Sequence, residues 1–367
     1  MSEPANQTVS RQWDPIPGYW KLLCALAVLV GHNLVTLTAW QTDFPPWRWI
    51  YHAVQFFSPY HFFLFSGYLA CSSLESPSVP LGKFMLSRAL RIQILVVAAF
   101  AWALGIRLLA TDGGAVGSLG TIWPLDVWDG PIDWRDALMH LSPFGFADHT
   151  KINYATWYLY QELRIILLFP IFRWILQRPS SFHRWMFLAL LWGAASVLEY
   201  KFWSFFPLFR SSPFQSLAYG CYFFLGVLAR QTTRSASFPT RLPWSLAWVV
   251  LGIGVGVSFF ESFSIRFPLS NPPILLVPIA AGQFLVVTAL CRLLPRIPAP
   301  SLLRRACDWS VGIYIVHPPL HVVATWWAVR TGNPWPLVPE ILLSIAGGAL
   351  FHHLVERPSN ILLRRLK

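Results

Sequence analysis

Charged side chains are scarce in this chain. Asp, Glu, Lys and Arg make up 12% of its 367 residues, whereas a soluble globular domain carries about 25%. Hydrophobic residues make up 55% of the sequence and gather in long runs. This composition excludes an ordinary soluble domain. It predicts an all-α polytopic membrane protein, because a helix satisfies its backbone hydrogen bonds within itself while crossing hydrocarbon.

Cysteines are few and dispersed, and they form no CxxC pair, so the sequence indicates neither a disulfide framework nor a zinc site. The adjacent His352 and His353 have no further ligand at metal spacing, and we expect no metal. The five cysteines are Cys24, Cys71, Cys221, Cys291 and Cys307.

Several motifs of soluble enzymes are missing. The chain has no Walker loop and no dinucleotide-binding GxGxxG, and no GxSxG elbow surrounds Ser66. The net charge of +12 does not require a nucleic-acid partner, because the basic residues lie in loops between apolar runs, as in membrane proteins. We therefore expect a lipid bilayer as the surroundings and no nucleic acid.

The apolar runs predict about ten transmembrane helices of about 20 residues each. Both termini are placed in the cytoplasm, because this orientation puts most Lys and Arg on the inner side. The polar tail 1–17 lacks the features of a cleavable signal peptide. We expect one membrane domain, 1–367, whose longest outer loop covers about residues 111–152. The predicted spans are roughly 18–40, 47–74, 84–110, 153–176, 185–200, 214–230, 244–262, 273–293, 309–329 and 338–356.

A few ionisable residues interrupt the apolar runs, where they are costly unless they are paired or face a cavity. His32 follows Lys21 by eleven residues, so a helix would place it about 16 Å deeper, near mid-membrane. A neutral imidazole there suits a general base, although a histidine bonded to a neighbouring carbonyl would also fit. His317 lies in a second such run.

Two further pairs are candidates for binding or catalysis. Arg88 and Arg91 share one face at the start of a predicted span and suit phosphate groups, or they are ordinary inner-face anchors. Glu162 and Arg164 are two residues apart and cannot face each other on one helix. Each is therefore expected to pair with another span, either within the site or as a structural ion pair.

Taken in order, these motifs resemble the membrane-bound acyltransferase family 3. The first helix carries a basic residue, ten residues and a histidine, and the second carries Phe-Phe-x-x-Ser-Gly. An arginine pair, Trp-x4-Glu with a later proline, a mid-chain glycine helix, an Ile-Tyr-x-x-His-x-Pro pattern and a terminal Glu-x-Pro follow. The matching residues are Lys21, His32, Phe62, Phe63, Ser66, Gly67, Arg88, Arg91, Trp157, Glu162, Pro170, Phe223–Arg230, Ile313–Pro319, Glu356 and Pro358.

The resemblance implies an O-acyltransferase of the bacterial cytoplasmic (inner) membrane, multi-pass. The donor would be cytoplasmic acyl-CoA, with acetyl-CoA expected. The acceptor would be a hydroxyl of an extracytoplasmic or lipid-linked glycan such as exopolysaccharide or O-antigen. Lys21, Arg88 and Arg91 are the expected donor-binding residues. The expected catalytic residues are His32, Glu162, Arg164, Tyr314 and His317.

Two questions stay open at this point. His32 would act either as the general base for direct transfer or as the carrier of a transient acyl group. A different class of protein, a permease or flippase that uses His32 and Glu162 as a proton relay, would also place charges in the membrane. Inverted repeats would favour that alternative, and the sequence shows none.

Overall fold

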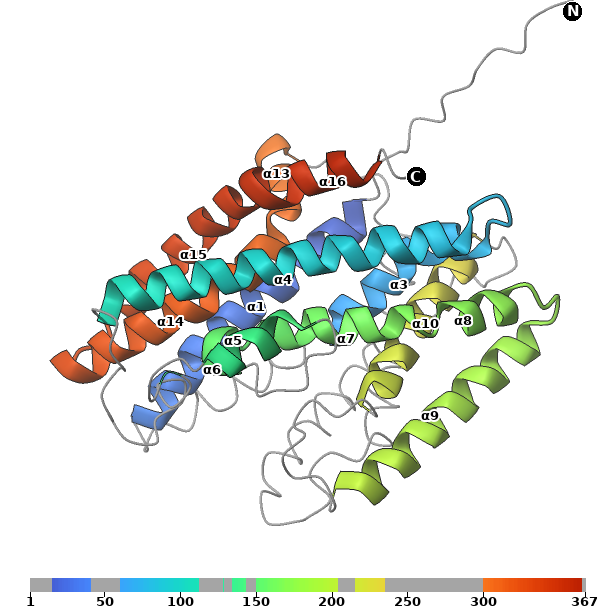
Figure 1. The fold of residues 1–367 in the computed structure, drawn as a ribbon, viewed down its shortest axis with the longest axis horizontal. Helices are drawn as coiled ribbons and strands as arrows, with labels where there is room; N and C mark the ends of the chain where they lie inside the picture. The colour runs from blue at the N-terminus through green and yellow to red at the C-terminus, as the bar shows by residue number, and fades with distance from the viewer. Residues whose placement is uncertain are drawn as a thin grey trace, which may run out of the picture.

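The computed structural model describes residues 15–40, 60–111, 128, 134–142, 150–203, 215–234 and 300–364. Within these ranges the regular elements are helical, which confirms the expected all-α class there (Figure 1). The predicted spans 244–262 and 273–293, the start of 47–74, the tail before residue 15 and most of the loop 111–152 lie outside the described residues.

The helices are α1 (Pro15–Trp40), α3 (Tyr60–Glu75), α4 (Leu81–Thr111), α5 (Trp134–Leu141), α6 (Thr150–Asn153), α7 (Thr156–Ile166), α8 (Phe169–Leu176), α9 (Ser181–Trp203), α10 (Gln215–Arg234), α13 (Ser301–Asp308), α14 (Ser310–Thr331), α15 (Leu337–Phe351), the π-helix η2 (His352–Glu356) and α16 (Arg357–Arg364). Among these residues, two helical stretches, Leu81–Ala110 and Leu337–Leu363, are long and apolar enough to cross a bilayer. The ten-span topology stays a prediction.

The predicted span 153–176 is not one unbroken helix. It covers α7 and α8, which a turn at Leu167–Leu168 separates, and a further turn at Tyr154–Ala155 separates α7 from α6. At the Tyr154–Ala155 turn the Asn153 side chain accepts a hydrogen bond from the Ala155 backbone N–H (3.1 Å). Pro170 lies in the first turn of α8, where its missing N–H costs little. The Tyr154–Ala155 turn places Asn153 and Tyr154 against neighbouring helices.

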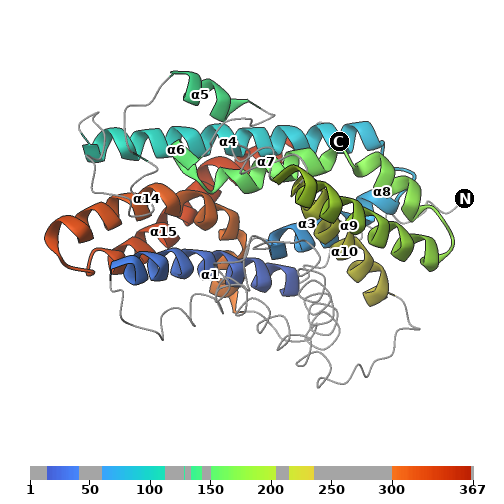
Figure 2. The same cartoon turned by 90° about the horizontal axis from the view of Figure 1, so that it is seen from below.

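The long helices run side by side in the views of Figures 1 and 2, with α14 packed against α1, α4 and α15, and α3 packed against α10. Glycines allow the closest crossings. A Cβ on Gly67 of α3 would collide with the Phe223 backbone of α10, and a Cβ on Gly226 of α10 with the Leu64 backbone of α3. This explains the paired Ser-Gly and Gly-helix motifs as a helix contact, in line with the packing of small residues in membranes.

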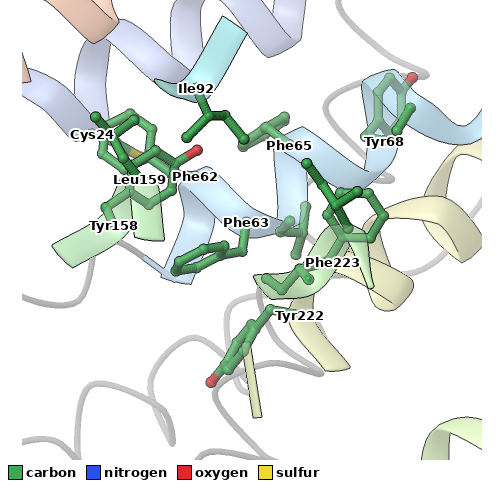
Figure 3. Packing of buried hydrophobic residues seen from close by; sticks show 14 of the residues in the cluster. Cys24, Phe62, Phe63, Phe65, Tyr68, Ile92, Tyr158, Leu159, Tyr222 and Phe223 are labelled. Atoms are coloured by element: carbon green, nitrogen blue, oxygen red, sulfur yellow. The ribbon is translucent and has the colours of Figure 1, made fainter. Parts of the chain in front are cut away.

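The core between these helices contains many aromatic rings among its aliphatic side chains. In Figure 3, Phe62 and Phe63 of α3 lie beside Tyr158 of α7, and Phe223 of α10 packs nearby. The Phe63 and Tyr158 rings have centroids 4.8 Å apart. Large aromatic rings bury much apolar area with little loss of side-chain freedom. The polar site residues are therefore held in a rigid apolar frame.

The two ends of the bundle differ in charge. At one end, here called the basic end, Arg173 of α8 donates to the carbonyls of Ser76 and Val79 (both 2.8 Å) in the turn between α3 and α4. Most of the described basic residues are at this end: Lys21, Lys83, Arg88, Arg91, Arg173, Arg178, Arg184, Arg230, Arg304, Arg305 and Arg357. At the other end α4 finishes and α14 turns into α15 through Gly332, whose φ is +66°. This asymmetry agrees with a basic end in the cytoplasm.

Candidate active site

Three histidines from two helices meet in the interior. His32 of α1 lies with its Nδ1 2.9 Å from Nε2 of His317 on α14. His321, one turn further along α14, contacts the Thr36 hydroxyl through Nε2 (3.0 Å), and its ring centroid lies 6.1 Å from that of His32. The Tyr154 hydroxyl lies 3.4 Å from His32 Nδ1. His317 and His321 are fully buried.

Backbone carbonyls of α14 determine how His317 is protonated. Pro318 and Pro319 have no N–H, so the carbonyls of Tyr314 and Ile315 lose their usual helical donors. The Asn153 side chain donates to the Ile315 carbonyl (3.0 Å). His317 Nδ1 bonds to the carbonyl of Ile313 (3.3 Å). A carbonyl only accepts, so Nδ1 of His317 carries the proton.

The position of the proton on His317 also determines the tautomer of His32. A neutral His317 with its proton on Nδ1 presents a lone pair at Nε2, which accepts a hydrogen bond from Nδ1–H of His32. His32 is then the tautomer whose lone pair is on Nε2. A buried imidazole oriented by a partner at Nδ1 is the arrangement that makes the other nitrogen a general base. The His32–His317 contact thus selects the His32 tautomer whose lone pair is on Nε2.

Tyrosine hydroxyls surround the histidines. The Tyr314 ring lies 5.8 Å from the His317 ring and 5.7 Å from that of Tyr158, between centroids. Trp157 forms a hydrogen bond with the Tyr314 hydroxyl. The indole N–H only donates, so the Tyr314 O–H is left to donate elsewhere. Tyr314 is accordingly a candidate donor to a developing oxyanion.

A second polar cluster lies toward the basic end. Arg88 of α4 donates to the Glu162 carboxylate of α7 (2.9 Å) and to the Ser66 hydroxyl of α3. Tyr158 donates to the other Glu162 oxygen (3.0 Å). The Arg88 guanidinium also lies over the rings of Phe169 and Phe223, at 5.6 and 5.5 Å from their centroids. The expected pairing of Glu162 with a cation from another helix agrees with this geometry.

Arg91 has a separate partner. It lies 3.6 Å from Glu356 at the end of η2, and Glu356 also bonds to Nδ1 of His352 (2.9 Å). Glu356 is buried, whereas the Arg91 side chain is 43% exposed. Lys21 is within electrostatic reach of both arginines and both glutamates. Three cations and two carboxylates leave this cluster with one net positive charge.

The two arginines and Glu162 have different surroundings. Arg88 is enclosed by Glu162, Ser66 and two aromatic rings, whereas Arg91 is partly exposed beside Glu356. The Glu162 carboxylate bonds to Arg88 and Tyr158, and the neighbour of His32 Nδ1 is His317. The structure places Arg164 beside Tyr160 of α7.

Several residues of the site were not singled out from sequence. They are His321, Tyr154, Asn153, Tyr158 and Thr36. His321 had a visible signal, because it lies four residues after His317 and so shares its helix face. No sequence signal pointed to Asn153 and Tyr154, because their positions beside α14 and His32 depend on the turn before α7.

Comparison with known proteins gives one match. The model of acyltransferase family 3, described as an acyltransferase domain, matches residues 17–353. No curated protein and no solved structure matches the chain. The matched segment contains both polar clusters and every site residue named above except Glu356, which follows it by three positions.

Proposed function

The chain belongs to acyltransferase family 3, and from that premise we propose that it is a multi-pass O-acyltransferase of the bacterial inner membrane. The donor is cytoplasmic acyl-CoA, with acetyl-CoA as the expected form, and the acceptor is a hydroxyl of an extracytoplasmic or lipid-linked glycan. The observation that carries this proposal is the His32–His317 contact, which leaves a basic nitrogen on His32 in a largely apolar interior.

The donor's phosphates are proposed to bind at the basic end. Arg91 is the more exposed of the two arginines, and the buried Glu356 holds it in place. Lys21 adds a second cation on the helix that carries His32. Arg88 then serves to hold α3, α4 and α7 together rather than to contact phosphate. Charge-assisted hydrogen bonds of this kind are roughly twice as strong as neutral ones.

The two clusters share α1, which joins Lys21 to His32 across about 16 Å of helix. The pantetheine arm is proposed to run along this helix and to bring the thioester to the histidines. Holding the thioester beside a second reactant removes much of the entropic cost of their encounter.

His32 Nε2 takes the proton from the acceptor hydroxyl as its oxygen attacks the thioester carbonyl. The Tyr314 hydroxyl donates to the oxygen on which negative charge develops. The C–S bond then breaks, the new C–O ester bond remains, and His32 returns its proton to the thiolate, which gives coenzyme A. His317 stabilises the positive charge that His32 holds in between.

Replacing His32 tests this proposal. His32→Ala is expected to lower acyl transfer by about 10²–10⁴-fold, the usual contribution of a general base. The measurement is alkali-labile acyl ester on the cell's glycans, normalised to the amount of protein in the membrane. His183→Ala is the matched control, because His183 is exposed at the start of α9. Normal ester levels with His32→Ala would rule out His32 as the base.

A further inference from the structure

His352 lies beside the residues that are proposed to bind the donor. It begins the π-helix η2, and its Nδ1 lies 2.9 Å from Oε2 of Glu356, four residues further along. The His352 side chain is 17% exposed, so the imidazole is in contact with a buried carboxylate and also with the surroundings of the protein. π-Helical segments are rare and often occur at functional sites. His352 is therefore a candidate for a role in donor binding.

The Glu356 carboxylate links His352 to Arg91. Its Oε2 faces His352, and its Oε1 lies 3.6 Å from the Arg91 guanidinium. The Glu356 side chain is 3% exposed, whereas the Arg91 side chain is 43% exposed. A guanidinium has five N–H groups, so the contact with one carboxylate oxygen leaves most of them for a ligand. His352 restricts the carboxylate from its other side and thereby helps to orient Arg91.

The contact with Glu356 also determines which nitrogen of His352 titrates. An ionised carboxylate only accepts hydrogen bonds, so Nδ1 of His352 carries a proton in this contact. The other nitrogen, Nε2, is then the atom that gains or loses a proton as the pH changes. The hydrogen bond to Glu356 forms in both protonation states. Titration of His352 therefore changes the charge at this place without breaking the contact.

Charged groups of both signs surround His352. Asp308 of α13 and Arg357 at the start of α16 lie within electrostatic reach of the imidazole, and Arg91 of α4 approaches the same carboxylate. His353 is its neighbour in η2, with ring centroids 5.4 Å apart. In the part of the chain that the structure describes, α14 and α15, which also pack on η2, add no charged group within that reach. Histidine ordinarily titrates between pH 5 and 8, so both states of this imidazole are relevant to the cell.

Protonation of His352 changes the charge that a phosphate meets at the basic end. The three cations and two carboxylates around Lys21 carry one net positive charge. A proton on His352 raises this charge to two. Opposite charges attract over several ångströms even where water screens them. A ligand with several phosphate charges is therefore bound more tightly by the protonated form.

We propose that His352 is a positioning residue of the donor site, which orients Arg91 through Glu356 and whose protonation makes the phosphates of acyl-CoA bind more tightly as the pH falls. The effect is electrostatic, so the imidazole does not have to touch the donor. This inference rests on the proposed function and adds a pH dependence to its donor site. A fall in cytoplasmic pH then increases the fraction of the protein that has donor bound.

Binding of coenzyme A to the whole protein in nanodiscs tests this inference without requiring turnover. The dissociation constant is measured by calorimetry at about pH 5.5 and about pH 8, on either side of the ordinary range of histidine. Phosphate groups also titrate near pH 6, so the native protein is compared with variants that share this contribution of the ligand. Relative to His352→Asn, the native protein should gain about threefold to thirtyfold in affinity at the lower pH. This is the range for one charge acting on a phosphate across about 8 Å, between the dielectric constants of water and of a protein surface.

Two substitutions of His352 separate its hydrogen bond from its charge. His352→Asn places an amide N–H at the position of Nδ1, so it keeps a donor to Glu356 and cannot gain a proton. His352→Leu removes both the donor and the charge, and it should bind coenzyme A more weakly than His352→Asn at about pH 8. His353→Asn is the matched control, because His353 is exposed in the same element and should not affect the pH dependence.

An equal pH dependence of binding in the native protein and in His352→Asn would overturn the inference, and so would its loss in His353→Asn. Failure of the inference is distinguishable from failure of the proposed function. If coenzyme A binds with the same pH dependence in both proteins and acyl transfer is intact, only the role of His352 is rejected. If coenzyme A binds the native protein at neither pH, the proposed donor is rejected and the inference with it.

Discussion

His317 offers the sharpest test of how the site is organised. His317→Leu removes the acceptor that lies 2.9 Å from His32 Nδ1. As His32 takes up a proton it becomes charged, and a hydrogen bond to a charged group contributes about 1.5–3 kcal/mol. At about 1.4 kcal/mol per tenfold change in rate, kcat should fall by about 10- to 150-fold. The KM for the donor should not change, because the residues proposed to bind its phosphates lie at the basic end.

His317→Gln is the comparison that isolates the hydrogen bond. The glutamine amide oxygen reaches the position of the imidazole Nε2, whereas both variants lose the Nδ1 contact to Ile313. Gln should therefore recover most of the rate that Leu loses. The assay is release of the coenzyme A thiol in nanodiscs, with thermal unfolding as a check on the fold. Equal rates for the Leu and Gln variants would refute the tautomer argument, as would a normal rate for Leu.

Two further predictions concern the packing of the helices. Arg88→Gln leaves Glu162 buried without its cation and should lower the free energy of unfolding by about 3–5 kcal/mol. Adding Glu162→Gln should recover most of that loss, measured by thermal unfolding of both variants. If the double variant is as unstable as Arg88→Gln alone, loss of the ion pair is not the cause. Gly226→Ala forces a Cβ into the Leu64 backbone and should reduce the amount of folded protein in membranes. Gly105 has open space around it, so Gly105→Ala should be neutral or should stabilise the fold by up to about 1 kcal/mol. Equal effects of the two substitutions would contradict the close crossing of α3 and α10.

Much of the helix pattern could be predicted from the sequence. The apolar runs at 18–40, 84–110, 214–230 and 309–329 correspond to α1, α4, α10 and α14 within a few residues. Such runs are local signals, because a helix bonds only to itself. The turns within the run 153–176 had no such signal. Hydropathy continues through Tyr154 and Leu167, where the structure has turns between helices.

The sequence by itself determined how the candidate residues are spaced along single helices. Lys21 and His32 both lie on α1, as their spacing within one apolar run predicts, and the proline pair of α14 can be read directly from the sequence. The tertiary structure decided the pairings. His32 contacts His317, which lies 285 residues further along the chain, Glu162 pairs with Arg88, and Glu340 accepts a hydrogen bond from Asn33. These contacts depend on which helices pack together and on their rotation about their axes. Spacing along the chain carries no information about either.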